Sequence, residues 1–117
     1  MTAPARLAAL AAKVEADPAA LVAARADGDA LADTLDGDPR GGDAALRWRI
    51  AVVRAVIAAP PDGDAVRELY GELVDRYRAQ PERLAALRPL GDEIRRLEAK
   101  GTLARSLVVR SDRRPRR

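Results

Sequence analysis

The residues that could carry catalytic chemistry are few in this chain of 117 residues. It has no His and no Cys, and its only serines, Ser106 and Ser111, lie late in the chain with no histidine to act as their base. Nucleophilic catalysis of the Ser–His or Cys–His kind is therefore excluded. Disulfides and thiolate metal sites are excluded by the lack of cysteine. The sequence predicts a protein that is not an enzyme and that holds no cofactor or metal.

Carboxylates are the remaining candidates, and several aspartates gather before and within a Gly-rich loop. A calcium loop needs a bidentate glutamate at its twelfth position, but counting from Asp36 that position is Arg47. The pair Gly41-Gly42 lacks the GK[ST] ending of a phosphate-binding loop, so a flexible turn is the better interpretation. Helix capping and solubility explain the aspartates best. They are Asp27, Asp29, Asp33, Asp36, Asp38 and Asp43.

Three arginines, Arg47, Arg49 and Arg54, flank the single tryptophan on one expected helix. Arg47 and Arg54 are seven residues apart, so they share a side of the helix with Trp48 nearby. One interpretation is a phosphate-contacting face with Trp48 as a platform for stacking bases. The other, which we favour, is a solvated face with Trp48 in the core or in a subunit contact, because acids lie close and one aromatic residue makes a poor platform.

The C-terminal segment is the most basic part of the chain. Residues 101–117 contain six Arg and one acid, Asp112, a balance of +5, so the rest of the chain carries −2 of the total of +3. Such a segment could contact DNA phosphates without reading sequence, dock on an acidic partner, or solubilise the protein. Its arginines are Arg105, Arg110, Arg113, Arg114, Arg116 and Arg117.

The elements that position these residues are predicted to be helices. In the first part, residues 1–36, one helix should begin at Pro4 and end near Ala16, and a second should follow with Asp17 as its cap. The second helix should run to about Asp36, unless Gly28 breaks it into two. Residues 36–43 are predicted to form a loop.

Residues 43–100 are predicted to form a helical hairpin and an oligomerisation core. A helix capped by Asp43 should end before Pro60-Pro61, and a second, capped by Asp64, should pack antiparallel to it. The apolar spacing predicts the hairpin core, formed by Leu46, Ile50, Val53, Ile57, Val66, Leu69, Leu73 and Tyr77.

A third helical stretch over residues 81–100 has the spacing of a coiled-coil seam. A kink or break is expected at Pro89 and Gly91. We expect this seam to line a subunit contact, through Leu87, Leu90, Ile94 and Leu97.

The third part comprises residues 101–117. Residues 102–110 should either extend a helix or form a short strand that pairs with a neighbouring subunit, because a lone strand needs a partner. The final residues, 111–117, are expected to be a disordered basic tail. The fold class is therefore all-α, with N-terminal helices, a hairpin and a C-terminal helix.

Bulky apolar residues are scarce, because Phe is absent and Trp48 is the only tryptophan. Leu, Val and three Ile must fill the core, since alanine contributes little on burial. We therefore expect a homo-oligomer that buries helix faces between subunits. No stretch approaches the roughly 18 apolar residues of a membrane span, and the N-terminus lacks a secretory signal, which predicts a soluble, cytoplasmic protein without a membrane partner.

The order of these segments resembles the small terminases of tailed phages and of phage-derived gene transfer agents. The resemblance covers about residues 31–117: LADTLDGDP before the loop, the hairpin from Asp43 to Tyr77, LRPLGDEIRRLEAKG, and TLARSLVVR with its tail. It implies an oligomeric ring built on the hairpin, with C-terminal strands between subunits. It also implies that the ring hands DNA to a large terminase, the ATP-driven motor, which the C-terminal segment would contact.

This chain departs from much of that family because it lacks a clear N-terminal DNA-reading domain. Its second helix is nearly devoid of side chains that read bases. The leading hypothesis is therefore a non-enzymatic packaging adaptor that binds DNA without sequence choice. The rivals are a small helical subunit of another nucleic-acid complex, such as a CRISPR effector, and a helical scaffold or regulatory protein with no nucleic-acid role.

Overall fold

The computed structural model describes residues 2–38, 40–58 and 62–103, and over these residues the fold is all-α with no strand. The proposed strand at 102–110 and the basic tail lie almost entirely outside these ranges; only Thr102 and Leu103 are described, and they form a bend. The elements are α1 (Ala3–Ala16), the 3-10 helix η1 (Pro18–Ala20), α2 (Leu21–Leu35), α3 (Gly42–Ala58), α4 (Gly63–Arg76), α5 (Pro81–Ala86) and α6 (Arg88–Ala99).

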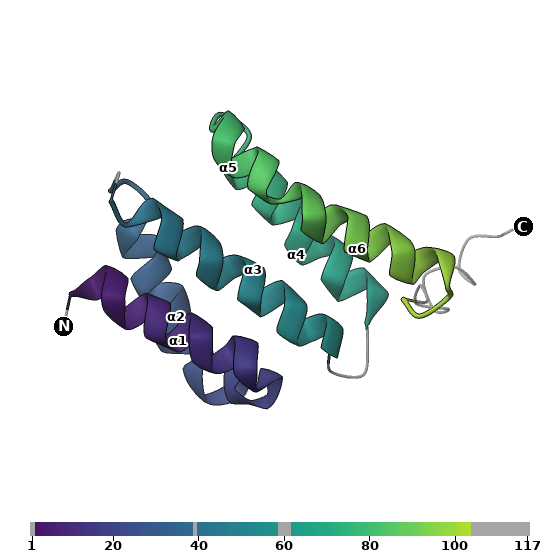
Figure 1. The fold of residues 1–117 in the computed structure, drawn as a ribbon, viewed down its shortest axis with the longest axis horizontal. Helices are drawn as coiled ribbons and strands as arrows, with labels where there is room; N and C mark the ends of the chain where they lie inside the picture. Colours follow the sequence, from purple (N-terminus) through teal and green to yellow (C-terminus); the bar gives the residue numbers. More distant parts are fainter. Residues whose placement is uncertain (1, 39, 59–61, 104–117) are drawn as a thin grey trace, which may run out of the picture.

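Helix α3 is the centre of the molecule. It runs between α1 and α2 on one side and α4 and α6 on the other (Figure 1). Its two sides are buried in two different clusters, with Trp48 in the first and Val53 in the second. A helix buried on both sides must carry apolar or very small residues around most of its circumference, and α3 does so.

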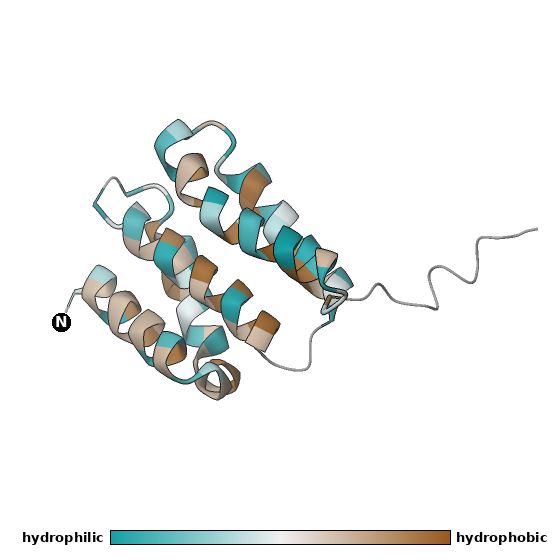
Figure 2. Cartoon of the chain, turned by 45° about the vertical axis from the view of Figure 1, so that its right-hand side comes forward, coloured by the Kyte–Doolittle hydropathy of each residue, from teal (hydrophilic) through white to brown (hydrophobic). Residues whose placement is uncertain are grey.

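The first core joins α1, α2 and α3 and is built largely from alanine. In Figure 2, α1 is drawn mostly in pale brown because alanine dominates its sequence. Small side chains let helices approach closely, and the indole of Trp48, fully buried, fills the remaining space against Gly28 of α2. The cluster contains Leu7, Ala11, Val14, Ala24, Ala32, Leu35, Ala45, Trp48, Ala51, Val52 and Ala55.

The second core joins α3 to α4, α5 and α6 and confirms the predicted hairpin. All the residues predicted for the hairpin core lie in this cluster. Three of them, Ile50, Ile57 and Leu69, are partly buried, and the others are buried. The periodic apolar stripes of α3 and α4 therefore predicted their contact correctly.

The predicted seam of the third helical stretch also lies in this second core. Leu87, Leu90 and Ile94 are 0%, 1% and 5% exposed within a single chain, and Leu97 packs against the same cluster. The stretch breaks at Leu87, with Pro89 in the first turn of α6. The prediction that this stripe lines a subunit contact was therefore wrong for its buried members, because a coiled-coil spacing fits any helical partner, including one in the same chain.

The helix starts follow the capping rules, but two of the predicted caps, Asp43 and Asp64, are not the capping residues. Asp17 caps η1, accepting a hydrogen bond from the backbone of Ala19 at 3.1 Å. Helix α4 is capped by Asp62 rather than Asp64, because the Asp62 carboxylate reaches the backbone N–H groups of residues 64 and 65. Asp43 lies in the first turn of α3, not at its cap. Gly28 lies inside a continuous α2.

Over the part of the chain that the structure describes, no helix combines the length and the apolar character that crossing a membrane requires. The absence of such a helix agrees with the sequence, where charges interrupt every apolar run.

The contact between Gly28 and Trp48 is testable by adding one methyl group. A Cβ at residue 28 would lie 2.0 Å from Cζ2 of Trp48, whereas a Cβ at Gly71, in α4, would meet nothing within 4 Å. We expect Gly28→Ala to lower the free energy of unfolding by about 1–3 kcal/mol in urea titrations, because overpacking outweighs the gain in helix propensity. Gly71→Ala, the matched control, should be neutral or stabilising by up to about 1 kcal/mol. Equal effects at the two sites would show that the indole is not packed against α2.

Candidate functional site

The predicted phosphate-contacting face on α3 is already occupied by acids of the same chain. The guanidinium of Arg47 donates two hydrogen bonds to Glu15 of α1, at 3.0 and 2.7 Å. The hydrogen bond from Arg47 is the main reason why the pKa of Glu15 lies below its usual value, and the same bond raises the pKa of Arg47. Arg54 lies 3.5 Å from a carboxylate oxygen of Glu93 in α6.

Trp48 cannot serve as a stacking platform, because its side chain is 0% exposed. The interpretation of Trp48 as a core residue is the correct one. Its indole N–H donates a hydrogen bond to Asp29 of α2 at 2.9 Å, and Arg25 donates another to the second oxygen of the same carboxylate at 2.7 Å. Asp29 thus satisfies the one polar atom of a buried indole.

The basic segment predicted to contact DNA lies outside the described residues. This applies to Arg105, Arg110, Arg113, Arg114, Arg116 and Arg117. Of the predicted contact residues, the structure therefore places only Arg47 and Arg54, and it turns each toward an acid of another helix.

The structure instead brings together a cluster around Arg49, which sequence reasoning missed. Arg49 is 9% exposed although it is charged. Its guanidinium donates to Asp33 at 3.0 Å, to Asp36 at 2.5 and 3.1 Å, and to the hydroxyl of Tyr77 at 2.9 Å. Arg76 of α4 donates to Asp36 as well, at 2.6 Å. The cluster therefore ties the end of α2 and the end of α4 to the middle of α3.

The electrostatics of Arg49 follow from this geometry. Burial alone would lower the pKa of Arg49, since a buried environment disfavours the charged form. The hydrogen bonds to Asp36 and Tyr77, with the negative charge of Asp36, outweigh burial and raise the pKa. The guanidinium thus stays charged, and its planar fork suits several acceptors at once.

Contacts between helices correct the interpretation as caps and solubilising residues for four of the six aspartates. Hydrogen bonds from Trp48 and Arg49 of α3 are accepted by Asp29, Asp33 and Asp36. Asp43 accepts a hydrogen bond from Arg83 of α5 at 3.2 Å. Asp38 has the local role predicted, accepting from the backbone of Arg40 at 2.8 Å in the loop, and Asp27 is an exposed residue of α2. The available signal was an arginine, Arg49, one residue before the apolar stripe member Ile50.

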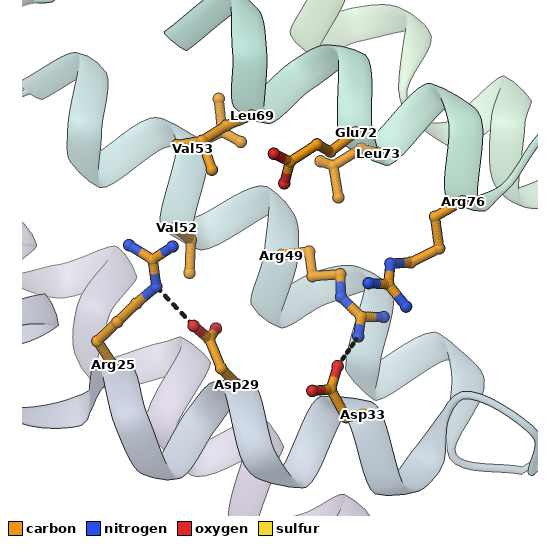
Figure 3. A pocket seen from close by; sticks show the side chains of 10 residues that line it. All are labelled: Arg25, Asp29, Asp33, Arg49, Val52, Val53, Leu69, Glu72, Leu73 and Arg76. Atoms are coloured by element: carbon orange, nitrogen blue, oxygen red, sulfur yellow. Dashed lines mark hydrogen bonds and ion pairs between the residues drawn. The ribbon is translucent and has the colours of Figure 1, made fainter. Parts of the chain in front are cut away.

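A cavity of about 220 Å³ lies beside the cluster, between α2, α3 and α4. Its lining, drawn in Figure 3, is apolar at Val52, Val53, Leu69 and Leu73 and charged around them. Arg25 and Arg76 lie at opposite ends, and the carboxylate of Glu72 extends from α4 toward the same space. The arginines and acids that line it, including Arg49 and Asp33, balance in charge.

The charged groups of this cavity are arginines and carboxylates. The lining side chains that could act as a nucleophile or a base are the carboxylates of Asp29, Asp33 and Glu72. No group of three or more potential ligands for a metal ion occurs within residues 2–38, 40–58 and 62–103. Its charged groups mainly bond to one another, so the arrangement best explains how three helices are held together.

The chain was also compared with models of known protein families, with curated proteins and with solved structures, and none of them matches it.

The Arg49 cluster predicts a large loss of stability when its centre is removed. We expect Arg49→Met to lower the free energy of unfolding by about 2–3 kcal/mol, because Asp36 and the Tyr77 hydroxyl lose a buried partner. Tyr77→Phe should cost about 1 kcal/mol, since it removes one hydrogen bond. Urea titration measures both.

The matched control is Arg78→Met, because Arg78 pairs with Asp75 on the surface with both side chains more than 70% exposed. An exposed pair contributes less than about 1 kcal/mol. Similar losses for Arg49→Met and Arg78→Met would contradict the cluster's structural role.

Proposed function

We propose that this protein is a non-enzymatic DNA-packaging adaptor of the small-terminase kind, which contacts nucleic acid through its basic C-terminal segment. The helical body would then serve assembly and docking on a large terminase, and the DNA contact would be independent of sequence. The segmental resemblance from residue 31 onward supports the packaging role. The distribution of charge supports the DNA contact.

The observation that carries the proposal is the contrast in charge balance between the helical body and residues 101–117. Most arginines of the helical body are bonded to acids of the same body, whereas residues 101–117 hold six Arg and only one acid. A run of uncompensated arginines binds polyanions by releasing their counterions. The paired arginines are Arg25, Arg47, Arg49, Arg54, Arg67, Arg76, Arg78, Arg83 and Arg95.

The pairing also restricts where DNA would bind. Arg47 and Arg54 would have to leave Glu15 and Glu93 before they could contact phosphate. The sequence of residues 101–117 offers its six arginines only one acid, Asp112. We therefore assign the first contact to Arg113, Arg114, Arg116 and Arg117, with Arg105 and Arg110 nearer to the body.

Ring formation would need surfaces other than the stripe at Leu87, Leu90 and Ile94, since these side chains are buried in the chain's own core. The segment after Leu103 remains the candidate for contact between subunits. Large terminase is the partner that the resemblance implies for the assembled ring.

The C-terminal contact is testable by neutralising three of its arginines. We expect the triple variant Arg113→Gln, Arg114→Gln, Arg116→Gln to bind a 20-base-pair duplex more weakly, because it loses contacts with phosphate. The slope of log K against log salt should also become smaller, by about 0.9 for each lost contact. Fluorescence anisotropy at several salt concentrations measures this. The control is Arg6→Gln, Lys13→Gln and Arg40→Gln, which removes the same charge from the body. Equal losses of duplex affinity and of salt slope in the two variants would contradict the role of the C-terminal segment in DNA binding.

RNA serves as a second ligand in the same titrations. Tighter binding to RNA than to DNA at equal salt would favour the alternative of a subunit from another nucleic-acid complex. Absence of salt-dependent binding to either would favour the scaffold alternative.

The ring is testable by light scattering of the full chain. We expect a mass several times the 12.5 kDa of one chain at micromolar concentration. A second measurement after removal of residues 104–117 should give a smaller assembly, because we assign the contact between subunits to this segment. A clean monomer for the full chain would contradict the ring.

A further inference from the structure

The outer face of α6 carries a row of basic residues that the sequence analysis did not single out. Arg88, Arg95, Arg96 and Lys100 are all exposed. Arg95 pairs with Asp92, one turn earlier on the same helix. The other three form no ion pair and no side-chain hydrogen bond with the part of the chain that the structure describes. Figure 2 shows α6 as a largely hydrophilic helix.

The acids of α6 explain why its bases are left over. Glu93 lies 3.5 Å from Arg54 of α3, and Glu98 bonds to Arg67 of α4. Arg67 also donates to the backbone carbonyl of Leu103 at 2.9 Å, which holds the end of the described chain against α4. The inward side of α6 thus uses its negative charges within the fold, and its outward side keeps the positive ones.

The other unpaired bases of the described chain do not form such a row. Arg6 and Lys13 lie on α1, and Arg40 lies in the loop before α3. Helix α1 packs against the opposite side of α3 from α6. Helix α6 carries Arg88 and Arg96, has Lys100 as its C-cap, and leads directly into the basic C-terminal segment.

The dimensions of this face suit a nucleic-acid backbone. Residues 88 and 100 are twelve positions apart, or about 18 Å along the helix at 1.5 Å per residue. Successive phosphates on one strand of a duplex advance by about 3.4 Å along its axis. The row therefore spans about five phosphates, and long side chains with several donors can adapt to their positions.

We propose that the outer face of α6 is a second contact site for the phosphate backbone, with Arg88, Arg96 and Lys100 as its phosphate-binding residues. This inference rests on the proposed function, and it extends the contact from the C-terminal segment onto the folded body. The two sites together would hold the nucleic acid along α6 rather than at a tail alone.

A membrane surface is a weaker candidate for this face. A helix that lies in a bilayer interface inserts large apolar residues beside its basic ones. Between the bases, the exposed positions of α6 include only Pro89 and Ala99. The exposed large hydrophobic residue of the described chain, Val22, lies on α2.

The test compares two triple variants of the full chain with identical changes in charge. The first variant removes the three proposed phosphate-binding charges through Arg88→Gln, Arg96→Gln and Lys100→Gln. Arg6→Gln, Lys13→Gln and Arg40→Gln remove two arginines and one lysine elsewhere. We expect the α6 variant to bind a 20-base-pair duplex at least tenfold more weakly than the control at low salt. Its slope of log K against log salt should be smaller by about 2–3, because three phosphate contacts are lost.

Further measurements separate the proposed contact at α6 from the proposed contact through the C-terminal segment. Circular dichroism should show unchanged helix content and melting for both variants, since the substituted side chains are exposed. Arg88→Lys with Arg96→Lys should keep most of the binding, because the contact depends on charge. If the chain binds DNA through its C-terminal arginines but the two triple variants bind equally well, this inference fails and the proposed function stands. If the unmodified chain binds no duplex, or binds only vesicles of anionic lipid, both fail.

Discussion

The position of Arg49 constrains the rest of the structure. A guanidinium that is nearly enclosed must be paired, because an isolated buried charge costs several kcal/mol. Its acceptors come from the end of α2 and from Tyr77, just after α4. The two groups of helices on either side of α3 therefore meet at one charge, and neither group can turn about α3 without breaking hydrogen bonds to it.

The part of the fold that sequence predicts well is the part with large, regularly spaced apolar residues. Leu46, Ile50, Val53 and Ile57 mark one side of α3, and that side packs against α4 as expected. The other side carries Ala45, Ala51 and Ala55 around Trp48. Alanine contributes little free energy on burial, so its pattern was given little weight. It nevertheless permits close approach of helices, and this is why the chain buries more within one copy than its few bulky residues suggested.

The polar partners are predicted less well, because they depend on contacts between distant residues. Asp36 and Arg76 are 40 positions apart, and Arg49 and Tyr77 are 28 apart. Local rules explain an aspartate by the turn or the cap next to it, as they do for Asp17 and Asp62. They cannot show that a carboxylate near a loop will be required by a charge on another helix, since that requirement arises only once the helices have packed.

The sorting of charge between the inside and the outside of the helical body follows from the same requirement. Arg54 and Arg67, on α3 and α4, face α6 and need acids, and Glu93 and Glu98 supply them. A helix that directs its acids inward leaves its bases outward unless other acids are added on that side, and α6 adds only Asp92, which Arg95 takes. The exposed basic face is thus a consequence of how the second core is neutralised, and it adjoins the segment that holds the largest excess of arginine in the chain. Binding of a polyanion to the outer face of α6 would need no rearrangement of the core, whereas binding at Arg47 or Arg54 would break ion pairs that join the helices.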